Sequence, residues 1–215
     1  MQQKNSTLET IFKISSILLH PLFIPTYLVA YLVFLCPNIF IGISPSTYKW
    51  WVVIVAYITI TFPLLVVILL WRLKFIESIY MKGDKERYIP LIASMLFYFW
   101  TFWLFHKQLA APAVLQSFLL GTFLTTVGVF LFTLFSKVSM HTAAFGGLFS
   151  FALILSFRAF QNSLLLLIVA ILLSGLIASA RLYLKAHNTN QVNTGFLIGF
   201  FAQFISFIIV LQFLF

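Results

Sequence analysis

The chain has 215 residues, of which 62% are hydrophobic and only 8% are charged, and its formal net charge is +9. A soluble domain is about 45–50% apolar, so this composition excludes an ordinary soluble domain and predicts an integral membrane protein. The single cysteine, Cys36, excludes an intrachain disulfide and a zinc site built from cysteines. The excess of positive charge suits anionic lipid headgroups or a phosphate-bearing substrate. Nucleic acid is not expected as a partner, because no soluble basic face is predicted.

Long apolar runs follow one another along the chain, and runs of about 18 or more residues are typical of membrane-spanning helices. Because lipid offers the backbone no hydrogen-bond partners, each run is expected to be helical. Seven runs are found, at Ile14–Cys36, Trp51–Trp71, Ile89–Phe105, Pro112–Phe135, Ala143–Phe157, Ser163–Ala180 and Gly195–Phe215. We therefore predict one all-α integral membrane domain over residues 1–215, a polytopic transmembrane helix bundle of about seven segments.

The first run, Ile14–Cys36, is longer than the roughly 7–15 apolar residues of a signal-peptide core, which indicates a retained membrane anchor. Pro21 and Pro25 are expected to bend it. His20 stands beside these prolines with no partner apparent in the sequence. We expect it to have a packing role.

The connections between the runs differ in charge. Those after the second, fourth and sixth runs read RLKFIESIYMKGDKERYIP, SKVSMHTAAF and RLYLKAHNTNQVNT, whereas the other three are nearly uncharged. With seven helices, the three charged loops emerge on the side that holds the N-terminus. That side carries ten of the 13 Lys and Arg residues, so the positive-inside rule places it in the cytoplasm. In a bacterium the membrane would be the inner membrane.

The three charged loops contain residues suited to phosphate chemistry. They are His141 and His187, with the cations Lys82, Lys85, Arg87 and Arg181. Arginine binds phosphate oxygens through its planar fork, and two histidines can supply a nucleophile and a general acid. No cluster has metal-ligand spacing. The loops therefore predict metal-free phosphoryl transfer that needs no cofactor.

The spacing of these residues also carries a family resemblance. Arg181, five residues, His187, three residues and Gln191 are followed by Gly195, which opens the next apolar run. The loop before the fifth run contains Ser139-Met140-His141, and the first charged loop contains KGDKERYIP. In order and position these stretches, within residues 82–199, resemble the three motifs of the type 2 phosphatidic acid phosphatase (PAP2) superfamily of membrane lipid phosphatases. That resemblance implies a six-helix core.

The resemblance implies a catalytic set of four residues, His187, His141, Arg181 and Gln191. His187 would attack phosphorus and form a phosphohistidine, while His141 would protonate the leaving oxygen and later activate water. Gln191 stands where the family motif has a carboxylate, and it would orient the His187 ring through a hydrogen bond. With glutamine at this motif position, the sequence is similar to dolichyl or polyprenyl diphosphate phosphatases.

The resemblance further implies a set of phosphate ligands. Arg87 and Ser139, with Arg181, would hold the non-bridging oxygens. Tyr80 occupies the place of the family's first lysine, for which Lys82 or Lys85 would substitute.

We expect a lipid phosphatase whose substrate is a polyprenyl diphosphate, phosphatidate or phosphatidylglycerol phosphate, with the first favoured by Gln191. Two alternatives remain open. One is an inactive relative that binds anionic lipid, which is favoured by Gln191, by the missing lysine and by Met140 in place of the motif glycine. The other is a transporter of lipid or phosphate, which is disfavoured because the apolar runs contain no acidic residue. The sequence does not indicate an oligomeric state.

Overall fold

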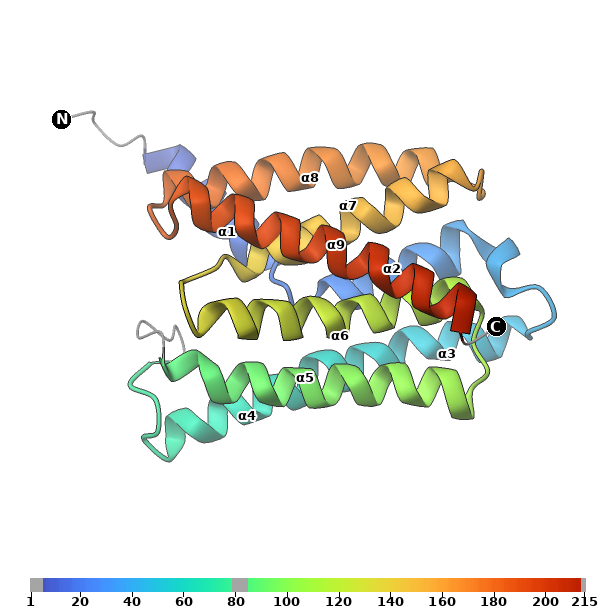
Figure 1. Cartoon of the computed structure of the whole chain (residues 1–215), viewed down its shortest axis with the longest axis horizontal. Coiled ribbons are helices and arrows are strands. Elements are labelled where there is room, and N and C mark those ends of the chain that lie inside the picture. The colour runs from blue at the N-terminus through green and yellow to red at the C-terminus, as the bar shows by residue number, and fades with distance from the viewer. Residues whose placement is uncertain (1–5, 79–84, 214–215) are drawn as a thin grey trace.

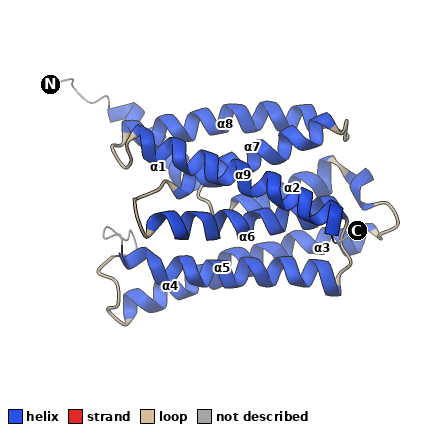
Figure 2. Ribbon diagram, in the orientation of Figure 1, coloured by secondary structure: helices blue, strands red, loops and turns tan. Residues whose placement is uncertain are grey.

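The computed structural model describes residues 6–78 and 85–213 of the chain, and in these ranges it contains helices and loops but no strand (Figure 2). The α-helices are α1 (Ser6–Leu18), α2 (Ile24–Leu35), α3 (Pro45–Ala56), α4 (Phe62–Arg72), α5 (Tyr88–Trp103), α6 (Ala113–Thr133), α7 (Met140–Phe157), α8 (Ser163–Tyr183) and α9 (Thr189–Phe213). Shorter elements are the 3-10 turns η1 (Pro37–Phe40) and η3 (Lys85–Arg87) and the π-helical turns η2 (Tyr57–Thr61) and η4 (Leu104–Gln108).

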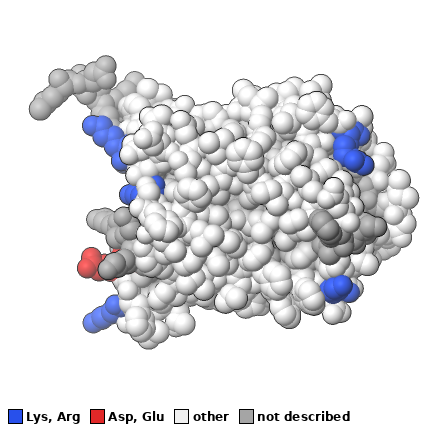
Figure 3. Space-filling view, viewed as in Figure 1, with Lys and Arg blue, Asp and Glu red and all other residues white. Residues whose placement is uncertain are grey.

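In the part of the chain that the structure describes, six helical stretches are long and apolar enough to cross a membrane. They are Pro45–Arg72, Tyr88–Gln108, Ala113–Thr133, Met140–Phe157, Ser163–Tyr183 and Thr189–Gln212. They run side by side along the long axis of the molecule (Figure 1). Lys and Arg side chains lie at the two ends of the face in Figure 3, with an uncharged band between them. The prediction of an all-α, polytopic helix bundle is confirmed.

The prediction that Ile14–Cys36 forms one continuous segment was wrong, because the chain leaves the helix between α1 and α2. Pro21 disfavours helical backbone at the residue before it, and α1 ends at Leu18. Pro25 lies in the first turn of α2, where its missing N–H has no cost. The 12 residues of α2 span about 18 Å, too short to cross a bilayer core of about 30 Å.

Together, α1 and α2 still carry the chain from one end of the bundle to the other (Figure 1). The start of α1 therefore lies at the same end as the loops α4–α5, α6–α7 and α8–α9, and we name this end the loop end. The predicted gathering of the charged loops is thus present. Their cytoplasmic location stays a prediction from the positive-inside rule.

Helices α7 and α9 pack closely enough that glycine is required at their contact. A Cβ atom at Gly199 would collide with the carbonyl oxygen of Ala143, and one at Gly146 with that of Phe196. At the loop end, a Cβ on Gly195 would come within 2.5 Å of the carbonyl oxygen of Ser139. Small residues of this kind let membrane helices approach backbone to backbone. The approach joins the first turn of α7 to the first turn of α9.

Candidate active site

The end of α8 places Arg181 and His187 close together. The helix closes with a turn in which Ala186 N–H donates to the Arg181 carbonyl at 3.1 Å and Lys185 N–H donates to that of Leu182 at 3.0 Å. This pair of bonds is a Schellman motif, with Lys185 at the left-handed position (φ 52°). His187, two residues after Lys185, donates its own N–H to the Arg181 carbonyl at 3.4 Å. Local backbone bonds therefore fix the histidine beside the arginine.

The start of α9 fixes the orientation of the His187 ring. Asn188 Oδ1 accepts from Gln191 N–H at 2.9 Å, and Gln191 Oε1 accepts from Asn188 N–H at 3.4 Å. This reciprocal pair is a capping box. The same Gln191 Oε1 lies 2.9 Å from His187 Nδ1. Because an amide oxygen only accepts, Nδ1 carries the ring proton, and the lone pair of Nε2 is left for chemistry.

The start of α7 is tied to this motif through the backbone. Ser139 N–H donates to the Gln191 carbonyl at 3.2 Å, and Ser139 Oγ accepts from Thr142 N–H at 3.4 Å as the N-cap of α7. Ser139 is completely buried. Its predicted role as a phosphate ligand stays a prediction, because in this structure the hydroxyl caps the helix.

His141, in the first turn of α7, makes its hydrogen bond to the N-terminal part of the chain. Its Nε2 lies 3.0 Å from the carbonyl oxygen of Ser16 in α1. A carbonyl only accepts, so Nε2 carries the proton in the neutral ring and Nδ1 has the lone pair. The two site histidines thus hold opposite tautomers.

Positive charge gathers around these histidines. Arg181, Lys137 and Arg87 all act electrostatically on His187. Burial, opposed by the Gln191 hydrogen bond and reinforced by these cations, lowers the pKa of His187 to about 4. The ring is therefore neutral near pH 7 and able to act as a nucleophile.

Arg181 supplies a donor without an acceptor. Its Nε is buried, and it has no hydrogen-bond partner in the part of the chain that the structure describes. The guanidinium of Arg87 lies within electrostatic range of it. A buried N–H without a partner costs free energy, and two neighbouring guanidinium groups repel each other. Both features favour an anion between them.

Six of the predicted site residues come together at the loop end: His187, Gln191, Arg181, His141, Arg87 and Ser139. Lys82 lies outside the described residues, as does Tyr80. Lys85 begins η3, but its side chain also lies outside the described part.

Residues that the sequence did not assign to the site also belong to this cluster. His20, for which packing was expected, lies between α1 and α2 with its ring centroid 5.2 Å from that of His141. The Ser16 carbonyl and Lys137 are further additions. Pro21 and Pro25, which follow His20 in the sequence, mark a helix break, and a helix break beside a histidine is the sequence feature that could have indicated this role.

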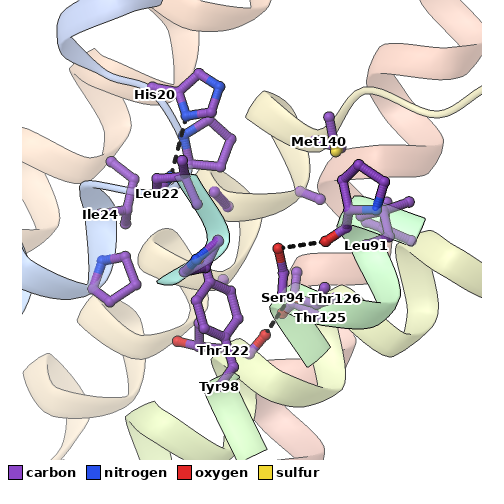
Figure 4. Close-up of a pocket in the computed structure, with 18 of the residues that line it drawn as sticks. His20, Leu22, Ile24, Leu91, Ser94, Tyr98, Thr122, Thr125, Thr126 and Met140 are labelled. Atoms are coloured by element: carbon purple, nitrogen blue, oxygen red, sulfur yellow. Dashed lines mark hydrogen bonds between the residues drawn. The ribbon is translucent and has the colours of Figure 1, made fainter. Parts of the chain in front are cut away.

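An apolar cavity of about 140 Å³ extends from this cluster into the membrane-spanning part of the bundle, between α2, α4, α5, α6, α7 and α9. Figure 4 shows His20 and Met140 toward one end of the cavity, and Tyr98 and Thr122 toward the other. Ser94 and Thr122 line the wall, but their hydroxyls donate to carbonyls of their own helices at 2.8 and 3.0 Å. Away from Arg87 and His20, the lining is therefore mostly apolar.

The cavity also explains where the Met140 side chain goes. The family motif has glycine at this place, and a methionine there must point away from a phosphate. Met140 lines the cavity.

Within residues 6–78 and 85–213, no group of three or more His, Cys, Asp or Glu side chains is arranged to hold a metal ion.

The described part of the chain is a bundle with six long apolar helices, and its loop end carries cations and histidines. These features define a polytopic membrane protein. Residues 124–214 match the family model of the PAP2 superfamily. The matched region holds Ser139, His141, Arg181, His187 and Gln191. Arg87 and His20 lie outside the match. No curated protein and no solved structure matches the chain.

Proposed function

We propose that this protein is a metal-independent phosphatase that removes phosphate from a membrane lipid through a phosphohistidine intermediate. The observation that carries the proposal is the Arg181 side chain, whose buried Nε has no hydrogen-bond partner among the described residues. It lies beside a neutral His187 whose Nε2 lone pair makes no hydrogen bond in the same part of the chain. The PAP2 match supports phosphatase activity at the level of the family.

In the first step, Nε2 of His187 attacks phosphorus while Arg181 and Arg87 hold the non-bridging oxygens. The bond between phosphorus and the lipid oxygen breaks as the P–N bond forms. His141, protonated on both nitrogens beside the bound phosphate, gives its Nδ1 proton to the leaving oxygen, since Nε2 is held by Ser16. Gln191 accepts the Nδ1 hydrogen of His187 throughout, which keeps the ring in its attacking orientation.

In the second step, Nδ1 of neutral His141 takes a proton from water as the water attacks phosphorus. The P–N bond breaks, inorganic phosphate leaves, and His187 returns to its starting form. The two guanidinium groups stabilise the charge on the phosphoryl oxygens in both transition states. No carboxylate charge stands beside His187, because Gln191 is neutral, so the cations carry most of the electrostatic stabilisation.

The apolar cavity supports a lipid as the substrate. It begins beside Arg87 and His20 and is lined further on by residues such as Leu91 and Leu148. A lipid whose phosphate lies between the arginines would place the first part of its tail there. Among polyprenyl diphosphate, phosphatidate and phosphatidylglycerol phosphate, we favour the diphosphate because of Gln191.

A relative that only binds anionic lipid would need the cations but neither histidine. Trapping the intermediate separates the two functions. We would mix purified protein with a polyprenyl diphosphate carrying ³²P in its terminal phosphate and quench in alkali, in which phosphohistidine survives. Label on the wild type and none on His187→Ala supports the proposal, and no label on the wild type contradicts it. His106→Asn, at the opposite end of the bundle, is the matched control and should be labelled like the wild type.

A further inference from the structure

The second site histidine, His141, is held by a part of the chain that lies outside the family match. The contacts come from the end of α1 and from the break before α2, which are residues 16–23, whereas the match begins at residue 124. Nothing in the three motifs predicts this contribution. It depends on how the broken first segment packs against the first turn of α7.

The Ser16 carbonyl is available because α1 ends early. In a continuous helix this carbonyl would accept from the N–H of His20, four residues later. Instead, His20 N–H donates to the carbonyl of Ile17 at 3.2 Å. The last carbonyls of a helix lack partners within the helix, and the one at Ser16 accepts from His141 at 3.0 Å.

The ring of His20 is itself fixed by the break. Leu22 N–H donates to His20 Nδ1 at 3.3 Å (Figure 4). In the neutral His20 ring, Nδ1 is therefore the acceptor and Nε2 carries the proton. It then meets the His141 ring edge to face, with an interplanar angle of 84°, a favoured geometry for planar rings. His141 is thus held by a hydrogen bond at one nitrogen and by a second ring against it.

We infer that His20 is a positioning residue for His141, and that together with the Ser16 carbonyl it holds the proton-transferring ring with Nδ1 toward the substrate. The inference deepens the proposed function and rests on it for the direction of the proton transfer. Without the flanking ring, His141 would turn about its side-chain bonds and exchange the two nitrogens. A misplacement of about 1 Å at such a group costs on the order of 100-fold in rate, and a partial loss of alignment costs less.

Substitutions at His20 separate a positioning role from a structural one. His20→Ala removes the ring, and we expect kcat to fall about 10-fold with little change in KM. His20→Phe keeps a ring against His141 and should retain most of the activity. His20→Asn can still accept from Leu22 N–H but has no ring, so it should behave like His20→Ala. Tyr27→Phe, which loses only a bond to the Leu18 carbonyl, is the control on the same segment.

The same variants give a readout that does not need activity. The chain has only four histidines, so ring-¹⁵N histidine labelling of the detergent-solubilised protein gives four assignable pairs of nitrogen signals. In the wild type and in His20→Phe, the His141 pair should show a protonated Nε2 and an unprotonated Nδ1. In His20→Ala and His20→Asn the two signals should move toward each other, as expected for a ring that exchanges tautomers.

Each result then has one meaning. If the His141 signals and kcat are both unchanged in His20→Ala, or if His20→Phe fails as badly as His20→Ala, the positioning role is wrong. If the signals change as expected but the wild type hydrolyses no lipid phosphate, the positioning of His141 stands and the proposed function fails. Melting temperatures of all variants within a few degrees of the wild type exclude global unfolding as the cause.

Discussion

The hydrogen bond between Gln191 and His187 provides the sharpest quantitative prediction. Gln191→Glu is isosteric and keeps an oxygen about where Oε1 now lies, 2.9 Å from Nδ1, but it adds a negative charge. A carboxylate favours the protonated imidazole. We therefore expect the pKa of His187 to rise from about 4 in this variant.

The size of the rise follows from the change in the bond. A hydrogen bond to a charged group contributes about 1.5–3 kcal/mol, compared with about 1 kcal/mol for a neutral one. The difference is about one pKa unit at about 1.4 kcal/mol per unit, and we take one unit because His187 is only half-buried and solvent screens the pair. Since the neutral ring is the nucleophile, the acid limb of kcat/KM should move up by about one pH unit.

The carboxylate should also pair with the nearby cations, so KM for the lipid phosphate should rise while kcat is retained or increased. The shorter Gln191→Asp should likewise preserve or raise activity.

Gln191→Leu removes the acceptor but leaves the Asn188 cap on α9, and kcat/KM should fall about 10-fold for the loss of one hydrogen bond. Phosphate release measured from pH 3.5 to 8 tests all three variants. If Gln191→Glu has the same acid limb as the wild type and Gln191→Leu keeps full activity, Gln191 does not orient or tune His187.

Three further predictions concern stability. Burial lowers the pKa of His187 from 6.5 to about 4, so between these pH values the unfolded state binds more protons than the folded state. The melting temperature should therefore fall as the pH is lowered from 6.5 toward 4. The fall should be smaller in His187→Gln. Gly199→Ala should cost about 1–3 kcal/mol through the clash with the α7 backbone, whereas Gly175→Ala, which meets nothing within 4 Å, should be harmless in the same thermal assay. Lys185→Gly should stabilise the protein by about 1 kcal/mol, because glycine adopts the left-handed turn (φ 52°) without strain, and it should leave phosphate release unchanged.

The parts of the fold that the sequence predicted are those set by local rules. Hydrophobic runs mark helices in lipid, and counting them placed the charged loops at one end. The placement of His187 beside Arg181 is likewise a local property, because a Schellman turn and a capping box are formed by residues that are neighbours in the chain. Asn188-Thr189-Asn190-Gln191 is readable as a capping box from the sequence alone.

The features that escaped prediction depend on contacts between distant segments. The ring contact of His20 with His141 joins residues 121 positions apart in the sequence. The periodicity of hydrophobic residues along the chain does not predict contacts between such distant residues. The two prolines alone predict a bend, whereas the helix breaks after Leu18. Pro21 disfavours helical backbone at the residue before it, and Pro25 favours the first turn of a new helix. The direction of Met140 could not be derived either, since it depends on a cavity formed by six helices.

Phosphate release in excess EDTA distinguishes a metal-independent histidine phosphatase from the alternatives. Purified, detergent-solubilised protein would be offered undecaprenyl diphosphate, phosphatidate and phosphatidylglycerol phosphate, with His187→Ala and His141→Ala measured beside the wild type. We predict that the wild type releases phosphate from at least one of the three lipids despite the chelator, and that both variants lose this activity. Loss of release on adding EDTA, or full activity in His187→Ala, would contradict a metal-independent histidine phosphatase.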